Sequence, residues 1–173
     1  TDLECYNKVR LDYINHFGYY CTESSEHNAE YNAFYIKDRY PELIERYNIP
    51  LDEYPRRCIN QIEAWVERRE KLLSGEGLEH ERSKEYASRI MEAMVTNVPY
   101  TIGGNVINNG VISNLPKEAC VEVPCICDAN GVTPMYVGNL PLQLAAMNAS
   151  NIYPQLLTIE AAHPGNKDAL YHA

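Results

Sequence analysis

The sequence contains no apolar stretch of the length that a membrane-spanning helix needs, and no basic segment followed by an apolar one near its N-terminus. A transmembrane helix requires about 20 largely apolar residues, so no segment here is predicted to cross a bilayer and no signal peptide is predicted. The motifs G-x-G-x-x-G and G-x-x-x-x-G-K-[ST] are also missing. No recognisable cradle for a dinucleotide or a nucleoside triphosphate is therefore present in this sequence.

Positive charge is scarce: 15 Lys and Arg stand against 24 Asp and Glu, which gives a net charge of −9. An acidic protein repels the phosphate backbone, so nucleic acid is excluded as an expected partner. Phe and Trp are rare, with 2 and 1 residues, whereas Tyr occurs 14 times. Tyr combines an apolar ring with a polar hydroxyl, which suits half-buried pockets and contacts between subunits.

The cysteines form no C-x-x-C motif. The six are Cys5, Cys21, Cys58, Cys120, Cys125 and Cys127. The chain has 173 residues and an ordinary globular composition, so it does not need disulfides to stabilise a small core. We predict buried free thiols, with a metal or redox role and disulfide bonding as the two alternatives.

Apolar periodicity predicts an α+β unit, with helices packed on a small, mostly antiparallel sheet. Spacings of three and four residues predict helices over 2–17, 28–39, 41–47, 56–73, 84–97 and 141–163. Alternating side chains and turn residues predict strands within 100–127 and over 132–137. Ser83 is expected to cap the helix at 84–97, and Pro154 is expected to kink or split the last helix.

The densest group of chemically useful side chains lies at residues 19–31, which include three Tyr, three Glu, two Ser, one Thr, one His and one Cys. If the segment were helical, the three glutamates could share one face, and paired carboxylates cleave glycosides in most glycosidases. The alternative is a polar loop in which Ser24 or Ser25 caps the following helix. A Ser–His nucleophile is disfavoured, because a separation of two or three residues rarely gives that geometry.

The block Gly18-Tyr19-Tyr20-Cys21-Thr22-Glu23-Ser24-Ser25-Glu26-His27, followed by Ala29-Glu30-Tyr31, resembles the GY-x-x-TESSEH-x-AEY block of α-galactosidases (melibiases). These enzymes belong to the NAD- and manganese-dependent glycoside hydrolase family four. Further matches follow in family order at 43–47, 50–58, 83–88, 104–106, 109–110, 114–116, 120–125, 137–138, 140–141 and 171–173. A ten-residue block with this many polar identities is highly specific, and the resemblance covers essentially the whole chain.

The resemblance implies that residues 1–173 form most of a C-terminal α+β domain similar to that of lactate and malate dehydrogenases, within a longer protein. An NAD-binding Rossmann domain is implied upstream, together with the Cys and His that ligate the metal in this family. NAD and Mn²⁺ are therefore expected to be bound mainly outside this chain, and no metal ligand is assigned within it. A cytoplasmic homo-oligomer is expected.

The chemistry that the resemblance implies starts with transfer of hydride from C3 of the sugar to NAD. A tyrosine then removes the C2 proton, the glycosidic group leaves by elimination, and water adds before the steps reverse. The family is an exception to the two-carboxylate mechanism, so Glu23 and Glu26 are not expected to act as an acid–base pair. Tyr19 is assigned as the base and Tyr20 is its competitor; a buried aromatic that anchors the loop is the structural alternative for Tyr19.

Free Tyr has a pKa near 10, so a nearby cation must favour the phenolate of the base. Glu26 and His27 are expected to face the substrate, and Arg57 and Asn105 are weaker candidates with structural or subunit-contact alternatives. The expected substrate is an α-linked galactoside such as melibiose. One alternative is α-glucuronidase, α-galacturonidase or α-glucosidase activity. Of these, the acid-sugar activities call for an extra cationic side chain. The other alternative is a non-catalytic sugar-binding or assembly module.

Overall fold

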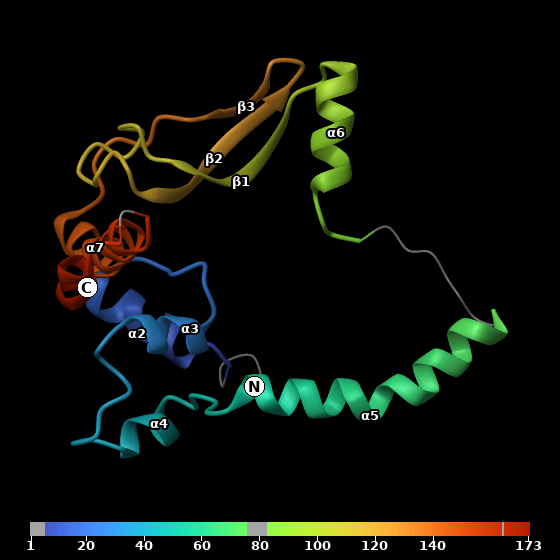
Figure 1. The fold of residues 1–173 in the computed structure, drawn as a ribbon, viewed down its shortest axis with the longest axis horizontal. Helices are drawn as coiled ribbons and strands as arrows, with labels where there is room; N and C mark the ends of the chain where they lie inside the picture. Colours follow the sequence, from blue (N-terminus) through green and yellow to red (C-terminus); the bar gives the residue numbers. More distant parts are fainter. Residues whose placement is uncertain (1–5, 76–82, 164) are drawn as a thin grey trace. The chain divides into compact units, whose positions relative to one another are not determined.

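The computed structural model describes residues 6–75, 83–163 and 165–173. The chain divides into two compact units, Thr1–Ser83 and Lys84–Ala173, whose elements are labelled in Figure 1. No helix in the described part of the chain is both long and apolar enough to cross a membrane. The first unit is helical and the second contains the sheet, so the α+β class predicted from the periodicity is confirmed.

The helices of the first unit are α2 (Lys8–Phe17), α3 (Ser25–Tyr31), α4 (Glu42–Arg46) and α5 (Glu53–Ser74). Residues 2–5 of the first expected helix lie outside the described residues. Helix α2 ends at Gly18, directly after the expected helix of 2–17. The φ of Gly18 is 79°, which is left-handed, and its N–H donates to the Ile14 carbonyl at 3.0 Å. Glycine adopts this conformation without a Cβ clash, so the chain turns sharply at this position.

The core of the first unit joins α2 to the segments on either side of α4. Val9 and Tyr13 are fully buried on α2. On the same helix, the Asp12 carboxylate accepts hydrogen bonds from the Tyr35 and Tyr47 hydroxyls at 2.9 and 3.2 Å. Burial, followed by the neighbouring Asp12, raises the pKa of Tyr35. The hydroxyl of Tyr35 therefore stays protonated at physiological pH and keeps donating to Asp12.

Helix α5 has 22 residues, all of them described, and none is buried. Its first turn contains Pro55, which is tolerated there because the first N–H groups of a helix have no intrahelical partner. Figure 1 shows α5 running away from the group formed by α2, α3 and α4. The helix predicted over 56–73 is therefore confirmed, and three further residues, from Glu53, precede it.

The second unit contains α6 (Ala87–Thr96), β1 (Tyr100–Ile107), β2 (Cys120–Asp128), β3 (Gly131–Pro134), α7 (Leu142–Ala162) and α8 (Lys167–His172). The strands form an antiparallel sheet in the order β1-β2-β3. Figure 1 shows α6 beside the end of the sheet where β2 turns into β3. The Asn97 side chain at the end of α6 accepts from the Ala129 N–H of that turn at 3.1 Å.

One face of β2 faces the core. Every second residue is buried: Val121, Val123, Cys125 and Cys127. The first three of these belong to a cluster that also contains Ala145 and Ile152 of α7. Alternation along β2 therefore directs one face of the sheet towards α7. None of the five described cysteines is in a disulfide.

Asn108 organises the loop between β1 and β2. It is fully buried, and its amide nitrogen donates to the carbonyls of Ile112, Leu115 and Pro116 at 2.9, 3.1 and 3.0 Å. Its amide oxygen accepts from the Ile112 N–H at 2.8 Å. One side chain thus supplies the hydrogen bonds that a loop without a ladder partner would otherwise lack.

Three local predictions need correction. Ser83 is not a helix cap, because α6 begins at Ala87 and Tyr86 occupies the N-cap position. The helix expected over 28–39 is instead α3 at Ser25–Tyr31, since Asn32 is already extended. Pro154 lies within the continuous helix α7 and does not split it.

Two adjacent glycines of β1 provide a matched test of the sheet packing. A Cβ at Gly104 would lie 2.8 Å from the Sγ of the buried Cys125, whereas a Cβ at Gly103 would lie 2.9 Å from the end of the flexible Glu122 side chain. We expect Gly104→Ala to lower the free energy of unfolding by about 1–3 kcal/mol, because the core is already close-packed. Gly103→Ala should change it by less than about 0.5 kcal/mol. Pulse proteolysis in urea on the full-length protein measures both; equal effects would contradict the packing described here.

Candidate functional site

Tyr19 directly follows the helix-ending Gly18, and its position in the loop is set by that left-handed turn. The side chain is 49% exposed. The alternative in which Tyr19 is a buried anchor of the loop is therefore wrong for this unit. An accessible phenol next to a rigid helix end can meet a ligand without rearrangement of the core.

Tyr20 has a different environment. The Arg10 guanidinium carbon lies 4.6 Å from the centroid of the Tyr20 ring. This is cation–π geometry, in which the ring face stabilises the charge. Tyr20 therefore holds Arg10, whereas Tyr19 makes no cation–π contact within the described residues.

Arg10 fixes the loop that follows Tyr20. Its Nε donates to the Cys21 carbonyl at 3.0 Å and its Nη2 donates to the Thr22 carbonyl at 2.9 Å. Its Nη1 donates to the Asn7 side chain at 3.1 Å. Hydrogen bonds from a charged donor stabilise more than neutral ones, so one guanidinium holds two consecutive backbone groups against α2.

Ser24 caps α3, as the loop alternative predicted. Its hydroxyl oxygen accepts from the His27 N–H at 3.2 Å. The buried Asn28 side chain donates to the carbonyls of Glu23 and Ser24, at 2.9 Å in each case. These bonds fix the start of α3, so Glu23 precedes the helix and does not share a helical face with Glu26 and Glu30.

Glu23 and His27 form an exposed pair. The Nδ1 of His27 lies 3.2 Å from the Oε1 of Glu23. The pKa of Glu23 is lowered, first by the hydrogen bond from the Ser24 N–H and then by the one from His27. Because the pKa is depressed, this carboxylate favours the fold above its unfolded pKa, and that contribution is lost as the pH falls through the folded pKa.

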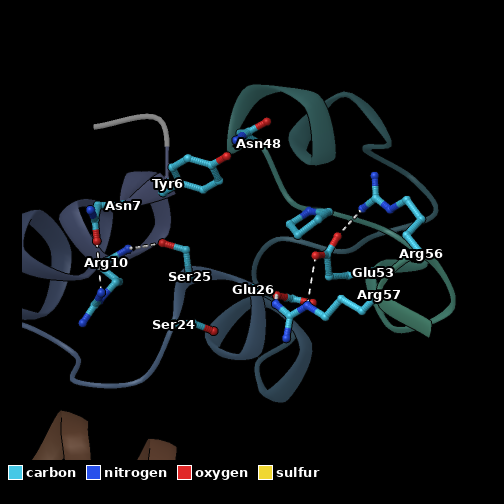
Figure 2. Close-up of a pocket in the computed structure, with 11 residues that line it drawn as sticks. Tyr6, Asn7, Arg10, Ser24, Ser25, Glu26, Asn48, Glu53, Arg56 and Arg57 are labelled. Carbon is cyan, nitrogen blue, oxygen red and sulfur yellow. Dashed lines mark hydrogen bonds and ion pairs between the residues drawn. The ribbon is translucent and has the colours of Figure 1, made fainter. Parts of the chain in front are cut away.

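Glu26 points into a separate pocket of about 520 Å³ (Figure 2). The pocket is lined by Tyr6, Asn7, Arg10, Ser24, Ser25, Glu26, Asn48, Pro50, Glu53, Arg56 and Arg57. These residues come from α2 and the two residues before it, from the start of α3 and its N-cap, from the segment before α5 and from the first turns of α5. Two of the residues singled out in the sequence, Glu26 and Arg57, meet here.

The two carboxylates of this pocket, Glu26 and Glu53, are paired with arginines of α5. Glu53 accepts from Arg56 at 2.7 Å and from Arg57 at 3.0 Å, in the three- and four-residue spacings that bring helical side chains together. Arg57 also lies 3.8 Å from the Glu26 carboxylate, and its side chain is exposed. Exposed pairs of this kind contribute little stability, so the pocket offers exchangeable donors and acceptors suited to a hydroxylated ligand.

The predicted site residues thus fall into two groups. Glu26 and Arg57 line the pocket, whereas Tyr19 and His27 are not among its lining residues. Asn105 belongs to the second unit, where it is exposed on β1 opposite Glu122. Within the first unit, the structure therefore brings together one of the two predicted substrate-facing residues and one weaker candidate.

Several residues of the site were not predicted. Arg10 contacts the loop that follows the end of α2. Glu53 pairs with two arginines, of which Arg57 also approaches Glu26. The spacing of Glu53, Arg56 and Arg57 on a helix is a signal that could have been used. No comparable local signal exists for Arg10. Within the described residues, no three His, Cys, Asp or Glu side chains gather in a way that could hold a metal ion.

A family model described as the family 4 glycosyl hydrolase C-terminal domain matches residues 1–173. The chain belongs to this family. As a family 4 glycosyl hydrolase C-terminal domain, it contains the TESSEH block at the start of α3 and the pocket beside it. The family predicted from the sequence is confirmed.

Curated relatives of this family 4 domain are enzymes. The chain is 56% identical to an α-galactosidase of Bacillus subtilis (strain 168) over 97% of its own length and 39% of the relative. It is 35% identical to an α-galactosidase of Rhizobium meliloti (strain 1021), over 94% of the chain and 35% of the relative. An α-galacturonidase of Thermoanaerobacter italicus is 25% identical over 96% of the chain and 37% of the relative. The chain thus spans less than two fifths of the length of each of these relatives.

Solved structures share the fold of this family 4 domain. A crystal structure of LplD from Bacillus subtilis, assigned as a glucosidase, matches 96% of the chain and 37% of its own, with a TM-score of 0.81 and 22% identity. A 6-phospho-α-glucosidase from gut microorganisms, solved with NAD and Mn²⁺, matches the same shares with a TM-score of 0.69 and 20% identity. At these identities the likeness establishes the fold.

Proposed function

We propose that this chain is most of the C-terminal domain of an α-galactosidase, which cleaves α-linked galactosides such as melibiose. The observation that carries the proposal is the 56% identity to the Bacillus subtilis α-galactosidase over 97% of the chain. The second relative, at 35% identity, has the same name. We further propose that the NAD-binding part is contained in the rest of the full-length protein. The chain covers only 39% of the length of the Bacillus subtilis relative, which leaves room for such a part.

Tyr19 is the proposed base that takes the proton from C2 of the sugar. Its support is its position after the rigid turn at Gly18 and its half-exposed phenol. Tyr20 is the competing candidate: the Arg10 guanidinium on its ring is a cation of the kind that favours a phenolate, but that guanidinium also donates to the Cys21 and Thr22 carbonyls, which gives Tyr20 a positioning role. In this proposal Tyr20 positions Arg10 and the loop, and Tyr19 transfers the proton.

Glu26 and His27 are the proposed substrate-facing groups, with different means of contact. Glu26 lies 3.8 Å from Arg57 in the pocket and can accept hydrogen bonds from sugar hydroxyls there. His27 is exposed beside Glu23 and can donate or accept according to its tautomer. A sugar ring that contacts both Glu26 and His27 would require the loop at 19–24 to keep its position. Arg10 holds this loop in place.

NAD and Mn²⁺ are proposed as the cofactors of the full-length enzyme. The described residues of this chain do not gather a metal-ligand group and contain no glycine-rich cradle, so they do not fit either group by themselves. When bound elsewhere in the enzyme, NAD would supply the oxidation at C3 that makes the C2 proton acidic. This chain's contribution is the base and part of the substrate pocket.

The full-length protein is also proposed to be a cytoplasmic homo-oligomer. The five described cysteines are free, as expected in a reducing compartment. Tyr, Ile, Val and Leu side chains are exposed along several elements of the first unit, which favours burial against other polypeptide surfaces.

The test uses the full-length protein under reducing conditions with α-galactosides, with and without NAD and Mn²⁺. We expect hydrolysis that needs both additions, because the cofactors act in the chemical step. Hydrolysis that persists after both have been removed by dialysis and chelation would overturn the oxidation–elimination route. Folded protein that binds galactosides yet cleaves none would favour a sugar-binding module.

A matched panel of α-galactosides, α-galacturonides and α-glucosides tests the specificity. The pocket contains Arg10, Arg56 and Arg57, the kind of cation that an acid sugar requires. Arg56 and Arg57 are already paired with Glu53, so we expect the neutral galactoside to be preferred. A higher kcat/KM for the galacturonide would replace the proposed substrate with an acid sugar.

A further inference from the structure

Arg10 is shared by the candidate pocket and by the loop that contains Tyr19. It lines the pocket, and its backbone N–H donates to the hydroxyl of Ser25, the first residue of α3, at 3.4 Å (Figure 2). Its guanidinium donates to the Cys21 and Thr22 carbonyls at 3.0 and 2.9 Å. One half-buried residue of α2 therefore contacts both the loop and the helix that follows it.

The backbone of Tyr19 is held on both sides by α2. On one side, the Gly18 N–H donates to the Ile14 carbonyl at 3.0 Å. On the other side, the Tyr20 ring centroid lies 4.6 Å from the Arg10 guanidinium carbon. Ile14 and Arg10 are about one helical turn apart on α2, or roughly 6 Å along the axis. The phenol of Tyr19 is therefore attached to a backbone that α2 fixes at two points.

The contacts of Arg10 require the shape of a guanidinium. This group is planar, so its edge can donate to two carbonyls while its face packs on an aromatic ring. Arg10 does both, on the loop carbonyls and on the Tyr20 ring, and its Nη1 donates to the Asn7 side chain at 3.1 Å. Lysine has the same charge but only a compact ammonium group, which cannot make these contacts together. Arg10→Lys therefore separates the shape of the side chain from its charge.

We propose that Arg10 is a positioning residue that keeps the Tyr19 phenol within reach of the C2 proton of a sugar bound in the pocket. A general base must lie within hydrogen-bond distance of the proton that it removes. Arg10 contacts both the loop of Tyr19 and the pocket, so it acts on the proton transfer through Tyr19 without touching the reacting atoms. The inference rests on the proposed function, in which Tyr19 is the base.

The activity test compares Arg10→Lys with Arg46→Lys in the full-length protein. The Arg46 guanidinium carbon also lies over a ring, 5.6 Å from the centroid of Tyr47, but its side chain makes no hydrogen bond within the described residues. We expect Arg10→Lys to lower kcat for α-galactosides about 100-fold, because a misplacement of about 1 Å has an effect of this size. The change in KM should be smaller. Arg46→Lys should leave kcat within about threefold of the unmodified protein.

The ratio of two partial reactions distinguishes positioning from a purely structural role. Exchange of the C2 proton with deuterated solvent depends on the base, whereas transfer of hydride from C3 to NAD precedes it. We expect Arg10→Lys to lower the exchange about 100-fold, and to lower the formation of reduced nicotinamide in a single turnover much less. Partial unfolding would lower both reactions equally, so equal losses would contradict the proposal.

Alkylation of Cys21 tests the hold on the loop without substrate or cofactor. The thiol is partly buried, and this burial raises its pKa. Release of the loop should expose the thiol and increase its thiolate fraction. We expect Arg10→Lys to accelerate the labelling about tenfold relative to the exposed Cys120, because two hydrogen bonds from a charged donor are lost. Asn7→Ala, which removes only the acceptor of Nη1, should give a smaller increase, and Arg46→Lys should give none.

Failure of this inference is distinguishable from failure of the proposed function. A full-length protein without any C2 exchange would overturn the proposed base chemistry and this inference with it. Exchange in the unmodified protein, with Arg10→Lys and Arg46→Lys alike in exchange and in Cys21 labelling, would overturn the role of Arg10 alone. If circular dichroism shows that Arg10→Lys does not fold, equal Cys21 labelling in Asn7→Ala and Arg46→Lys would overturn that role.

Discussion

Tyr19→Phe in the full-length protein is expected to lower kcat for α-galactoside hydrolysis by about 10³-fold, within the range that loss of a general base produces. The substitution removes one hydroxyl from a half-exposed ring and leaves the turn at Gly18 intact, so KM should change little. Exchange of the C2 proton of the sugar with deuterated solvent measures the affected step directly. This exchange should disappear with the hydrolysis.

Tyr20→Phe is the matched control. Phe keeps the ring on which the Arg10 guanidinium packs at 4.6 Å, so the loop held by Arg10 should be preserved. We expect kcat within about threefold of the unmodified protein, since a surface change of this size is usually worth under 0.5 kcal/mol. If Tyr20→Phe stops the exchange and Tyr19→Phe does not, the base is Tyr20.

Asn108→Ala is expected to destabilise the second unit by about 3 kcal/mol or more, because each buried polar group left without a partner costs about 1–3 kcal/mol. The substitution removes the partner of the Ile112 N–H and one hydrogen bond from each of three loop carbonyls, all made by Asn108 at 2.8 to 3.1 Å. The carbonyls of Ile112 and Pro116 keep the N–H groups of Leu115 and Ala119 as donors. Amide hydrogen exchange of β2 in the full-length protein should accelerate roughly 100-fold if these amides exchange by opening of the unit.

Asn148→Ala provides the comparison for this result. Asn148 is an exposed residue of α7 whose side chain makes one hydrogen bond, to the Leu144 carbonyl at 2.9 Å. Its removal should change the exchange of β2 by less than about threefold, the effect of a typical surface substitution. Equal acceleration in the two variants would show that Asn108 does not hold the unit together.

The elements that could be predicted are those whose own residues repeat a pattern. The alternation of Val121, Val123, Cys125 and Cys127 identified both a strand and its buried face, because side chains of a strand point alternately to opposite faces. Gly18 likewise marked the end of α2. The α+β class follows from these local signals, and the TESSEH block identified the family.

The remaining features depend on contacts between distant segments. Arg10 could not be linked to residues 21–22, because the link exists only after the chain reverses at Gly18. Asn108 could not be singled out from the sequence, because its role depends on three carbonyls that converge on it. For the candidate site, the sequence identified Glu26 and Arg57. It did not indicate that the Glu53 carboxylate pairs with both Arg56 and Arg57.

The thiols of β2 have a practical consequence for oxidation and chemical labelling. Cys125 and Cys127 are completely inaccessible, whereas Cys120 at the start of the same strand is exposed. A thiol reacts only when reagents can reach it, so an alkylating agent modifies Cys120 in the native protein and the other two only during an opening of the sheet. The ratio of the two modifications, read by mass spectrometry, therefore reports how often this unit opens inside a living cell.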